Sequence, residues 1–151
     1  MNQKISREDL IPIAILSAGD GKIEGKTRLQ KLAFLLDEEK LGDRFDAYEF
    51  RKYDYGPFSK ELLEDVEDLK EKNLVEIRKS RTFGGNTRYD YRLTEMGRKV
   101  AKDLFQQEDA SVVFEQAVEI FTEYGDLPLR DLIELVYEKY PEYEENSVYQ
   151  Y

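Results

Sequence analysis

The sequence predicts an α+β, mainly α-helical fold, namely a winged helix-turn-helix domain with a C-terminal helical extension. Apolar residues recur with helical spacing in six segments, and residues 75–93 change to the alternation of a β-hairpin. The order helix, helix, short strand, helix, hairpin and helix is typical of a winged helix, with the hairpin as the wing. We therefore expect a domain over residues 1–106 and an extension over 107–151.

The first predicted helix covers residues 10–17. Asp9 is its expected cap, and Pro12 falls in its first turn, where a missing N–H group costs no helical hydrogen bond. The second helix has Thr27 as its expected cap and ends at Gly42. Its apolar stripe consists of Leu29, Leu32, Ala33 and Leu36.

An aromatic-rich segment, residues 48–53, predicts a short strand before the third helix. The following segment, residues 53–57, is interpreted as a rigid turn, with a small recognition surface as the alternative. Ser59 is the expected cap of the third helix, and Asn73 its left-handed terminator. The apolar stripe of this helix consists of Leu62, Leu63, Val66 and Leu69.

The hairpin is predicted to begin at Val75 and end at Leu93, with a glycine-bearing tip at residues 83–86. This tip is no phosphate-binding loop, because it lacks the spaced glycines and the lysine. Thr94 is the expected cap of a fourth helix that runs to about Phe105. The residues expected to face inward are Met96, Val100, Ala101 and Leu104.

Two further helices are predicted over residues 112–124 and, after Pro128, over residues 129–140. Their apolar stripes either extend the core or form a homodimer interface. The acidic and tyrosine-rich segment 142–151 is expected to be a surface tail, with packing on the domain or on a second subunit as the alternative.

The composition excludes several classes of site. The chain has neither cysteine nor histidine, which removes disulfides, the usual zinc ligands and the commonest general base. We therefore expect no enzyme activity, no cofactor and no metal. Residues 1–9 are polar and no apolar run is long enough to cross a bilayer, so we expect a cytoplasmic protein without a membrane partner.

Three motifs in order carry a resemblance to a known family: residues 25–32 (GKTRLQKL), residues 53–59 (YDYGPFS) and residues 91–97 (YRLTEMG). Together they resemble the YwgA-like family and the wider SocA/Panacea group of antitoxin-associated domains. Residues 136–143 (VYEKYPEY) are similar to a YwgA-like C-terminus. The resemblance implies a winged-helix-like fold without catalysis, and a role in gene regulation or as an antitoxin or adaptor.

The predicted wing is basic on an acidic chain. Residues 75–102 hold eight basic and three acidic residues, a net charge of +5, whereas the whole chain carries −10 and the remainder therefore −15. Beside the mobile tip, four basic residues are candidates for contacts to phosphates or a minor groove: Arg78, Lys79, Arg81 and Arg88. The alternative is a solvated hairpin edge whose charges prevent pairing with other strands.

A second basic cluster, Lys26, Arg28 and Lys31, opens the second helix, where backbone N–H groups also favour anions. An ordinary solvated helix start is the alternative. The third helix carries six acidic residues against three lysines, which opposes the common mode of docking into the major groove of DNA. If DNA is bound, we expect the wing and the second helix to make the contact.

The function that these patterns favour is a nucleic-acid-binding regulator that uses the basic wing and the start of the second helix. The alternative is a protein–protein interaction module of the antitoxin or adaptor type, which would use the acidic third helix and the tyrosine-rich C-terminal extension. The expected partner is thus DNA or another protein, and the mechanism is binding rather than turnover.

Overall fold

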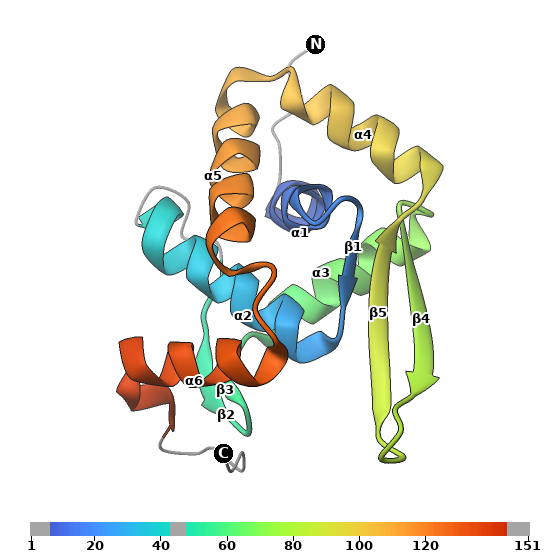
Figure 1. Cartoon of the computed structure of the whole chain (residues 1–151). Coiled ribbons are helices and arrows are strands. Elements are labelled where there is room, and N and C mark those ends of the chain that lie inside the picture. Colours follow the sequence, from blue (N-terminus) through green and yellow to red (C-terminus); the bar gives the residue numbers. More distant parts are fainter. Residues whose placement is uncertain (1–6, 43–47, 145–151) are drawn as a thin grey trace.

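The computed structural model describes residues 7–42 and 48–144, and its fold is α+β and mainly helical, as the sequence predicts (Figure 1). Its α-helices are α1 (Arg7–Ala18), α2 (Lys26–Leu36), α3 (Lys60–Glu71), α4 (Glu95–Phe105), α5 (Glu108–Tyr124) and α6 (Leu129–Lys139). Its strands are β1 (Lys22–Glu24), β2 (Arg51–Tyr53), β3 (Gly56–Phe58), β4 (Val75–Arg81) and β5 (Thr87–Leu93). The π-helical turn η1 (Asp37–Leu41) continues α2, and the short 3-10 helix η3 (Pro141–Glu144) follows α6.

The larger sheet is antiparallel, with β5 between β1 and β4. The predicted hairpin is confirmed: Val75 lies opposite Leu93, and Ile77 opposite Tyr91. Strand β1 adds Ile23 beside Tyr91. Because residues that face each other across a ladder share one side of the sheet, these five apolar side chains line the side that faces the core. Three residues are too few to show an alternation, so β1 was not predicted.

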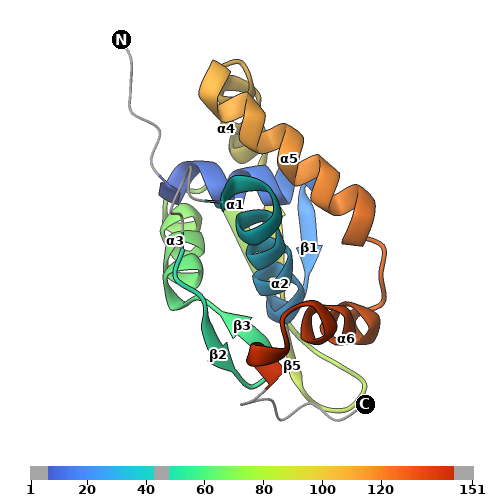
Figure 2. The same cartoon turned by 90° about the vertical axis from the view of Figure 1, so that its left-hand side faces the viewer.

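Helix α2 is enclosed on all sides. Every residue from Leu29 to Leu36 is buried, which is the property of a helix inside a core rather than on its surface. Helices α1, α5 and α6 and the β3 strand pack against it. Figure 2 shows the β2–β3 hairpin and α6 on opposite sides of the lower end of α2.

The C-terminal helices share this core. The apolar stripes of α5 and α6 are buried, and they belong to the same hydrophobic cluster as α1 and α2. The ring of Phe34 meets those of Tyr140 and Tyr143 edge to face, at centroid distances of 4.9 and 5.0 Å. These stripes therefore extend the core of the same chain. Tyr143 also packs on this core, which agrees with the alternative of packing on the domain, and residues 145–151 of the predicted tail lie outside the described part.

Local signals for three helix ends are confirmed. The Ser59 hydroxyl accepts a hydrogen bond from the Leu62 N–H group, and that of Thr94 from the Gly97 N–H group. Asn73 has a positive φ of 64° at the end of α3. These signals succeed because each one satisfies or redirects the backbone within a few residues.

Four local predictions are wrong. Helix α1 begins at Arg7, so Asp9 lies within it, and Pro12 lies in the second turn and not the first. Helix α2 has Gly25 at its N-cap, so Thr27 is not the cap, because the end of β1 at Glu24 sets where the helix begins.

The other two errors concern β2 and α4. The predicted strand 48–53 is reduced to Arg51–Tyr53, which pairs with the unpredicted strand β3. Met96, which is expected to face inward, is half-exposed, and the neighbouring Gly97 is the buried residue of this turn. A side chain is excluded there, since a Cβ on Gly97 would lie 2.0 Å from the Leu74 carbonyl oxygen.

We expect Gly97→Ala to lower the free energy of unfolding by about 1–3 kcal/mol, although alanine is the better helix former. The added methyl group forces α4 away from the Leu74 backbone. Gly84→Ala in the wing tip is the control, because no atom lies closer than 4.0 Å to a Cβ there. Chemical denaturation measures the stability of both variants. Equal stability of Gly97→Ala and Gly84→Ala would contradict the close contact between Gly97 and the Leu74 carbonyl oxygen.

Candidate nucleic-acid interface

The four candidate residues of the wing are all exposed and divide between its two faces. Lys79 and Arg81 lie on the face that continues the core side of the sheet, opposite Tyr89 and Thr87. Arg78 lies on the outer face, opposite Asp90, and Arg88 shares that face beside Ser80. The sequence alone does not show this division, because the register decides which side chains are neighbours.

The charge of Arg88 is partly balanced within the sheet. Its guanidinium group donates to Asp90 at 3.0 Å and lies 4.0 Å from Glu24 on β1. The Glu24 carboxylate accepts a hydrogen bond from Lys22, which together with the nearby cations holds its pKa below the usual value. The outer face of the wing is therefore a mixed-charge surface.

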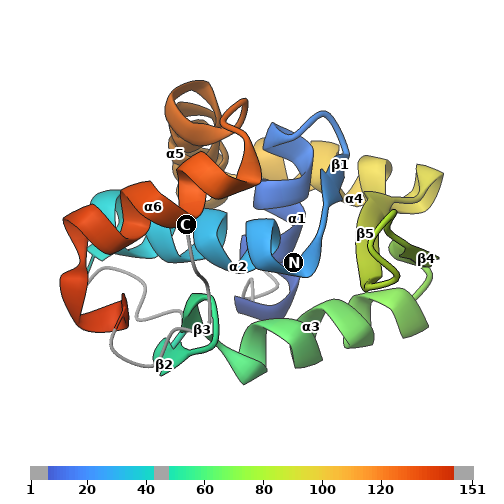
Figure 3. The ribbon, with the colours of Figure 1, turned by 60° about the horizontal axis from the view of Figure 1, so that its bottom comes forward.

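The start of α2 joins the wing. The Lys26 ammonium group lies 4.5 Å from the centroid of the Tyr89 ring, and the Gly25 N–H group donates to the Tyr89 carbonyl oxygen at 2.9 Å. Arg28 reaches in the other direction and donates to the Gly125 carbonyl oxygen at 3.4 Å. Two basic segments that are about 50 residues apart in the sequence thus form one surface at the end of the molecule that Figure 3 shows.

Lys31 departs from the prediction. Its side chain is only 1% exposed, and its ammonium group donates to the Tyr55 carbonyl oxygen. Burial lowers its pKa to about 7. The predicted contact of Lys31 with a nucleic-acid backbone does not fit this position, because the ammonium group lies beneath the β2–β3 hairpin.

The β2–β3 hairpin closes over Lys31 at a glycine. Gly56 has a positive φ of 108°, and a Cβ there would lie 3.1 Å from the Lys31 ammonium nitrogen and 3.2 Å from the Tyr137 ring. Gly56 thus needs both the backbone conformation and the small size of glycine. The segment 53–57 contains a turn, as predicted, but this turn joins the paired strands β2 and β3 and leaves Tyr53 and Tyr55 half-exposed.

A cavity of about 500 Å³ lies between the start of α2, the β2–β3 hairpin, the wing and the first residue of α6. Figure 3 shows the start of α2 between the wing on the right and β2–β3 and α6 on the left. The basic residues that line the cavity are Lys26, Arg28, Lys31 and Arg88, and the acidic ones are Glu24 and Asp54. Sequence reasoning did not reveal this cavity, because four separate segments build it.

Helix α3 presents an acidic surface. Glu64, Glu67, Asp68 and Glu71 are exposed together with Lys60, Lys70 and Lys72. Asp65 is buried instead, and its carboxylate accepts a hydrogen bond of 2.7 Å from the Tyr48 hydroxyl. This distribution agrees with the expectation that α3 opposes contact with phosphates.

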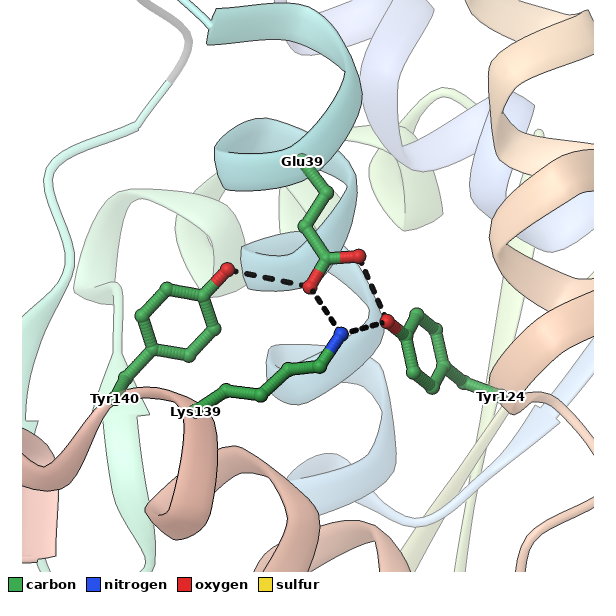
Figure 4. Close-up of polar contacts among 4 residues, drawn as sticks. All are labelled: Glu39, Tyr124, Lys139 and Tyr140. Atoms are coloured by element: carbon green, nitrogen blue, oxygen red, sulfur yellow. Dashed lines mark hydrogen bonds and ion pairs between the residues drawn. The ribbon is translucent and has the colours of Figure 1, made fainter.

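A second polar cluster ties the C-terminal helices to η1 (Figure 4). The Glu39 carboxylate accepts hydrogen bonds from Tyr124 at 2.7 Å, and from Lys139 and Tyr140 at 3.2 Å each. Partial burial acts to raise the pKa of Glu39, but these hydrogen bonds outweigh it and hold the pKa below its usual value. Burial raises the pKa of Tyr124 and of Tyr140 to about 12. Both hydroxyls stay protonated near neutral pH, and the cluster links the ends of α5 and α6 to η1.

Comparison with protein-family models finds no match, and neither does a search of curated proteins. Within residues 7–42 and 48–144, no group of three or more carboxylates is arranged to hold a metal ion. None of the helices in the described part of the chain combines the length and the apolar character needed to span a bilayer.

The buried Lys31 predicts a distinct pH dependence of stability. The unfolded chain keeps this proton up to a pKa of about 10.4, whereas the folded protein releases it near 7. Between these values the unfolded state binds more protons, so the contribution of Lys31 to stability rises with pH. Below pH 7 the folded state carries the cost of a buried charge.

We therefore expect Lys31→Met to be more stable than the wild type at pH 6, and this advantage to shrink by about 2 kcal/mol between pH 7 and 9. Urea denaturation at several pH values measures it. Lys99→Met, at an exposed position of α4, is the control and should show no such trend. A constant difference between wild type and Lys31→Met would contradict the lowered pKa.

Removal of the Glu39 charge should loosen the C-terminal helices. We expect Glu39→Gln to lower the free energy of unfolding by about 1–3 kcal/mol, and Glu38→Gln, at the exposed neighbouring position, to change it by less than about 0.5 kcal/mol. The pKa of Glu39 is lower in the folded protein than in the unfolded chain. The carboxylate therefore contributes to the free energy of unfolding above the pKa of the unfolded chain, and this contribution is lost as the pH falls through the pKa of the folded protein. The difference between wild type and Glu39→Gln should accordingly shrink in acid.

Proposed function

We propose that the chain is a non-enzymatic, winged-helix nucleic-acid-binding regulator. Its contact surface would combine the inner face of the wing with the start of α2. It would act by binding, with no chemical turnover.

The topology supports the winged-helix assignment. A short strand, β1, lies between the first two helices in the sequence and pairs with β5, the second strand of the hairpin. Helix α3 leads directly into β4, so the wing follows the third helix. This arrangement is that expected of a winged helix, in which a three-stranded antiparallel sheet supports a helical core.

The observation that carries the functional proposal is the contact between Lys26 and Tyr89. It joins the basic start of α2 to the wing, where Lys79 and Arg81 share the face of Tyr89. A polyanion that lies along this face would meet cations from both segments, whose combined charge favours phosphate contacts.

The tip of the wing adds an apolar contact. Phe83 is fully exposed at the tip, where its ring is accessible to a partner. Proteins that bind the minor groove often insert an apolar side chain of this type between base steps. Because the exposed face of α3 is acidic, we propose that the wing and the start of α2 lead the contact.

We also propose that the chain belongs to the YwgA-like or SocA/Panacea group. The structure offers a physical reason for each of its three motifs. Gln30 of the first motif makes two hydrogen bonds to the Ser59 backbone of the second, and Gly97 of the third packs on the Leu74 carbonyl oxygen. These residues are thus explained by packing, whatever the partner.

A second candidate function is a protein–protein interaction module of the antitoxin or adaptor type. The exposed acidic face of α3 favours it, because such a face suits a basic protein partner. The tyrosine-rich extension supports it less, since Tyr124, Tyr137 and Tyr143 pack within the chain. This candidate therefore depends on α3.

The register of the wing provides a matched experiment. Lys79→Gln with Arg81→Gln removes two charges from the inner face, whereas Arg78→Gln with Arg92→Gln removes two from the outer face. We expect the inner-face variant alone to weaken binding to a mixed pool of short DNA duplexes. For this variant, the slope of log K against log salt concentration should become less steep by about 2. Each phosphate that the variant no longer neutralises accounts for about 1 of this change.

Fluorescence anisotropy at two salt concentrations measures this effect. Equally weakened binding in both variants would contradict the assignment to the inner face. Absence of binding by the wild type at low salt would reject the regulator and favour the interaction module, which should depend on Glu64, Glu67 and Asp68.

A further inference from the structure

We propose that the cavity between α2, the β2–β3 hairpin, the wing and α6 binds a nucleoside phosphate, that is, a phosphate monoester attached to an aromatic body. Such a site takes a small ligand and does not require the nucleic-acid surface to be used.

The cavity has the size and the mixed lining of a ligand site. Its volume of about 500 Å³ lies within the range of about 300–1,000 Å³ that is common for small-molecule pockets. The α2 and wing side of the wall is basic, whereas the opposite side is formed largely by aromatic and apolar groups, including Tyr53, Phe58 and Leu129. A ligand with one anionic end and one flat apolar end would match both sides.

The charge of the wall indicates a dianion. Four basic residues and two acidic ones, Glu24 and Asp54, line the cavity, which gives a formal excess of two positive charges when Lys31 is protonated. A phosphate monoester carries about −1.5 to −2 at neutral pH, whereas a carboxylate carries only −1. Phosphate is therefore the better complement.

Buried donors are available at the anionic end. Lys31 is 1% exposed, and within the described part of the chain its ammonium group has one acceptor, the Tyr55 carbonyl oxygen, although it has three N–H bonds. The first turn of α2 adds backbone donors: Gly25 supplies no capping side chain, and no acidic residue lies in this turn. The space beside Gly25 is open, because a Cβ there would contact no atom within 4 Å.

The aromatic end offers a stacking surface. The rings of Tyr53 and Phe58 are stacked at a centroid distance of 4.7 Å, and Tyr53 is 52% exposed. An exposed, already stacked tyrosine presents a flat face on which a base can lie, and stacking of this kind tolerates any base. The wall thus favours a nucleoside over an aliphatic phosphate and does not select among bases.

If the proposed nucleic-acid surface is used, the ligand would regulate it, because Lys26 lines the cavity and also contacts Tyr89 on the inner face of the wing. Only this regulatory link rests on the proposed function.

Isothermal titration calorimetry with the full chain tests the site in the absence of DNA. We expect AMP to bind saturably, and adenosine, inorganic phosphate and benzoate each to bind at least about tenfold more weakly, since each lacks one part of the ligand. Lys31→Met and Tyr53→Ala should each weaken AMP binding by about tenfold or more. Lys99→Met is the matched control and should bind as the wild type does.

Absence of AMP binding, or binding that neither variant weakens, would overturn the proposal, as would tighter binding of benzoate than of AMP. Tyr53→Ala decides the question if Lys31→Met does not fold. An oligonucleotide with a 5′-phosphate distinguishes two sources of the ligand, a nucleic-acid end and a free nucleotide. If the oligonucleotide binds more tightly than AMP and the same variants weaken it, the site is assigned to a nucleic-acid end. If it binds more weakly than AMP, the site is assigned to a free nucleotide.

Discussion

Enclosure of α2 is the constraint on which the rest of the structure depends. A helix buried on every side must satisfy its polar side chains inside the core, and α2 carries two of them, Gln30 and Lys31. Gln30 donates to the Ser59 carbonyl oxygen and accepts from the Ser59 N–H group, whereas Lys31 donates to the Tyr55 carbonyl oxygen. Both partners are backbone groups of one short segment. The β2–β3 hairpin and the start of α3 are therefore held in place by the polar residues of α2.

The C-terminal helices complete this enclosure on the other side. Their apolar stripes cover α1 and α2, and Glu39 collects hydrogen bonds from the ends of α5 and α6. Because this cluster is built on η1, which continues α2, the same helix anchors both the hairpin and the extension. The extension is thus part of the core, and the polar link at Glu39 orients it.

The distribution of charge follows from the same arrangement. Acidic residues cover α3, and basic residues gather where the start of α2 meets the wing. An excess of negative charge over the whole chain does not prevent a local positive surface, because exposed charges separated by more than about 8 Å are largely screened at physiological salt. The cavity lies within this positive end, beside the exposed rings of Tyr53 and Tyr55.

The sequence by itself determined the features that act over a few residues: the mainly helical α+β class, the caps at Ser59 and Thr94, the left-handed Asn73 and the hairpin. Their physical cause is local, since a cap or an alternation satisfies or exposes groups on its own segment. Only the tertiary structure decided that Lys31 is buried, that β1 pairs with β5, and that Lys26 meets Tyr89. Burial and cross-strand register depend on segments that are distant in the chain, and no periodicity in one segment records what another segment covers.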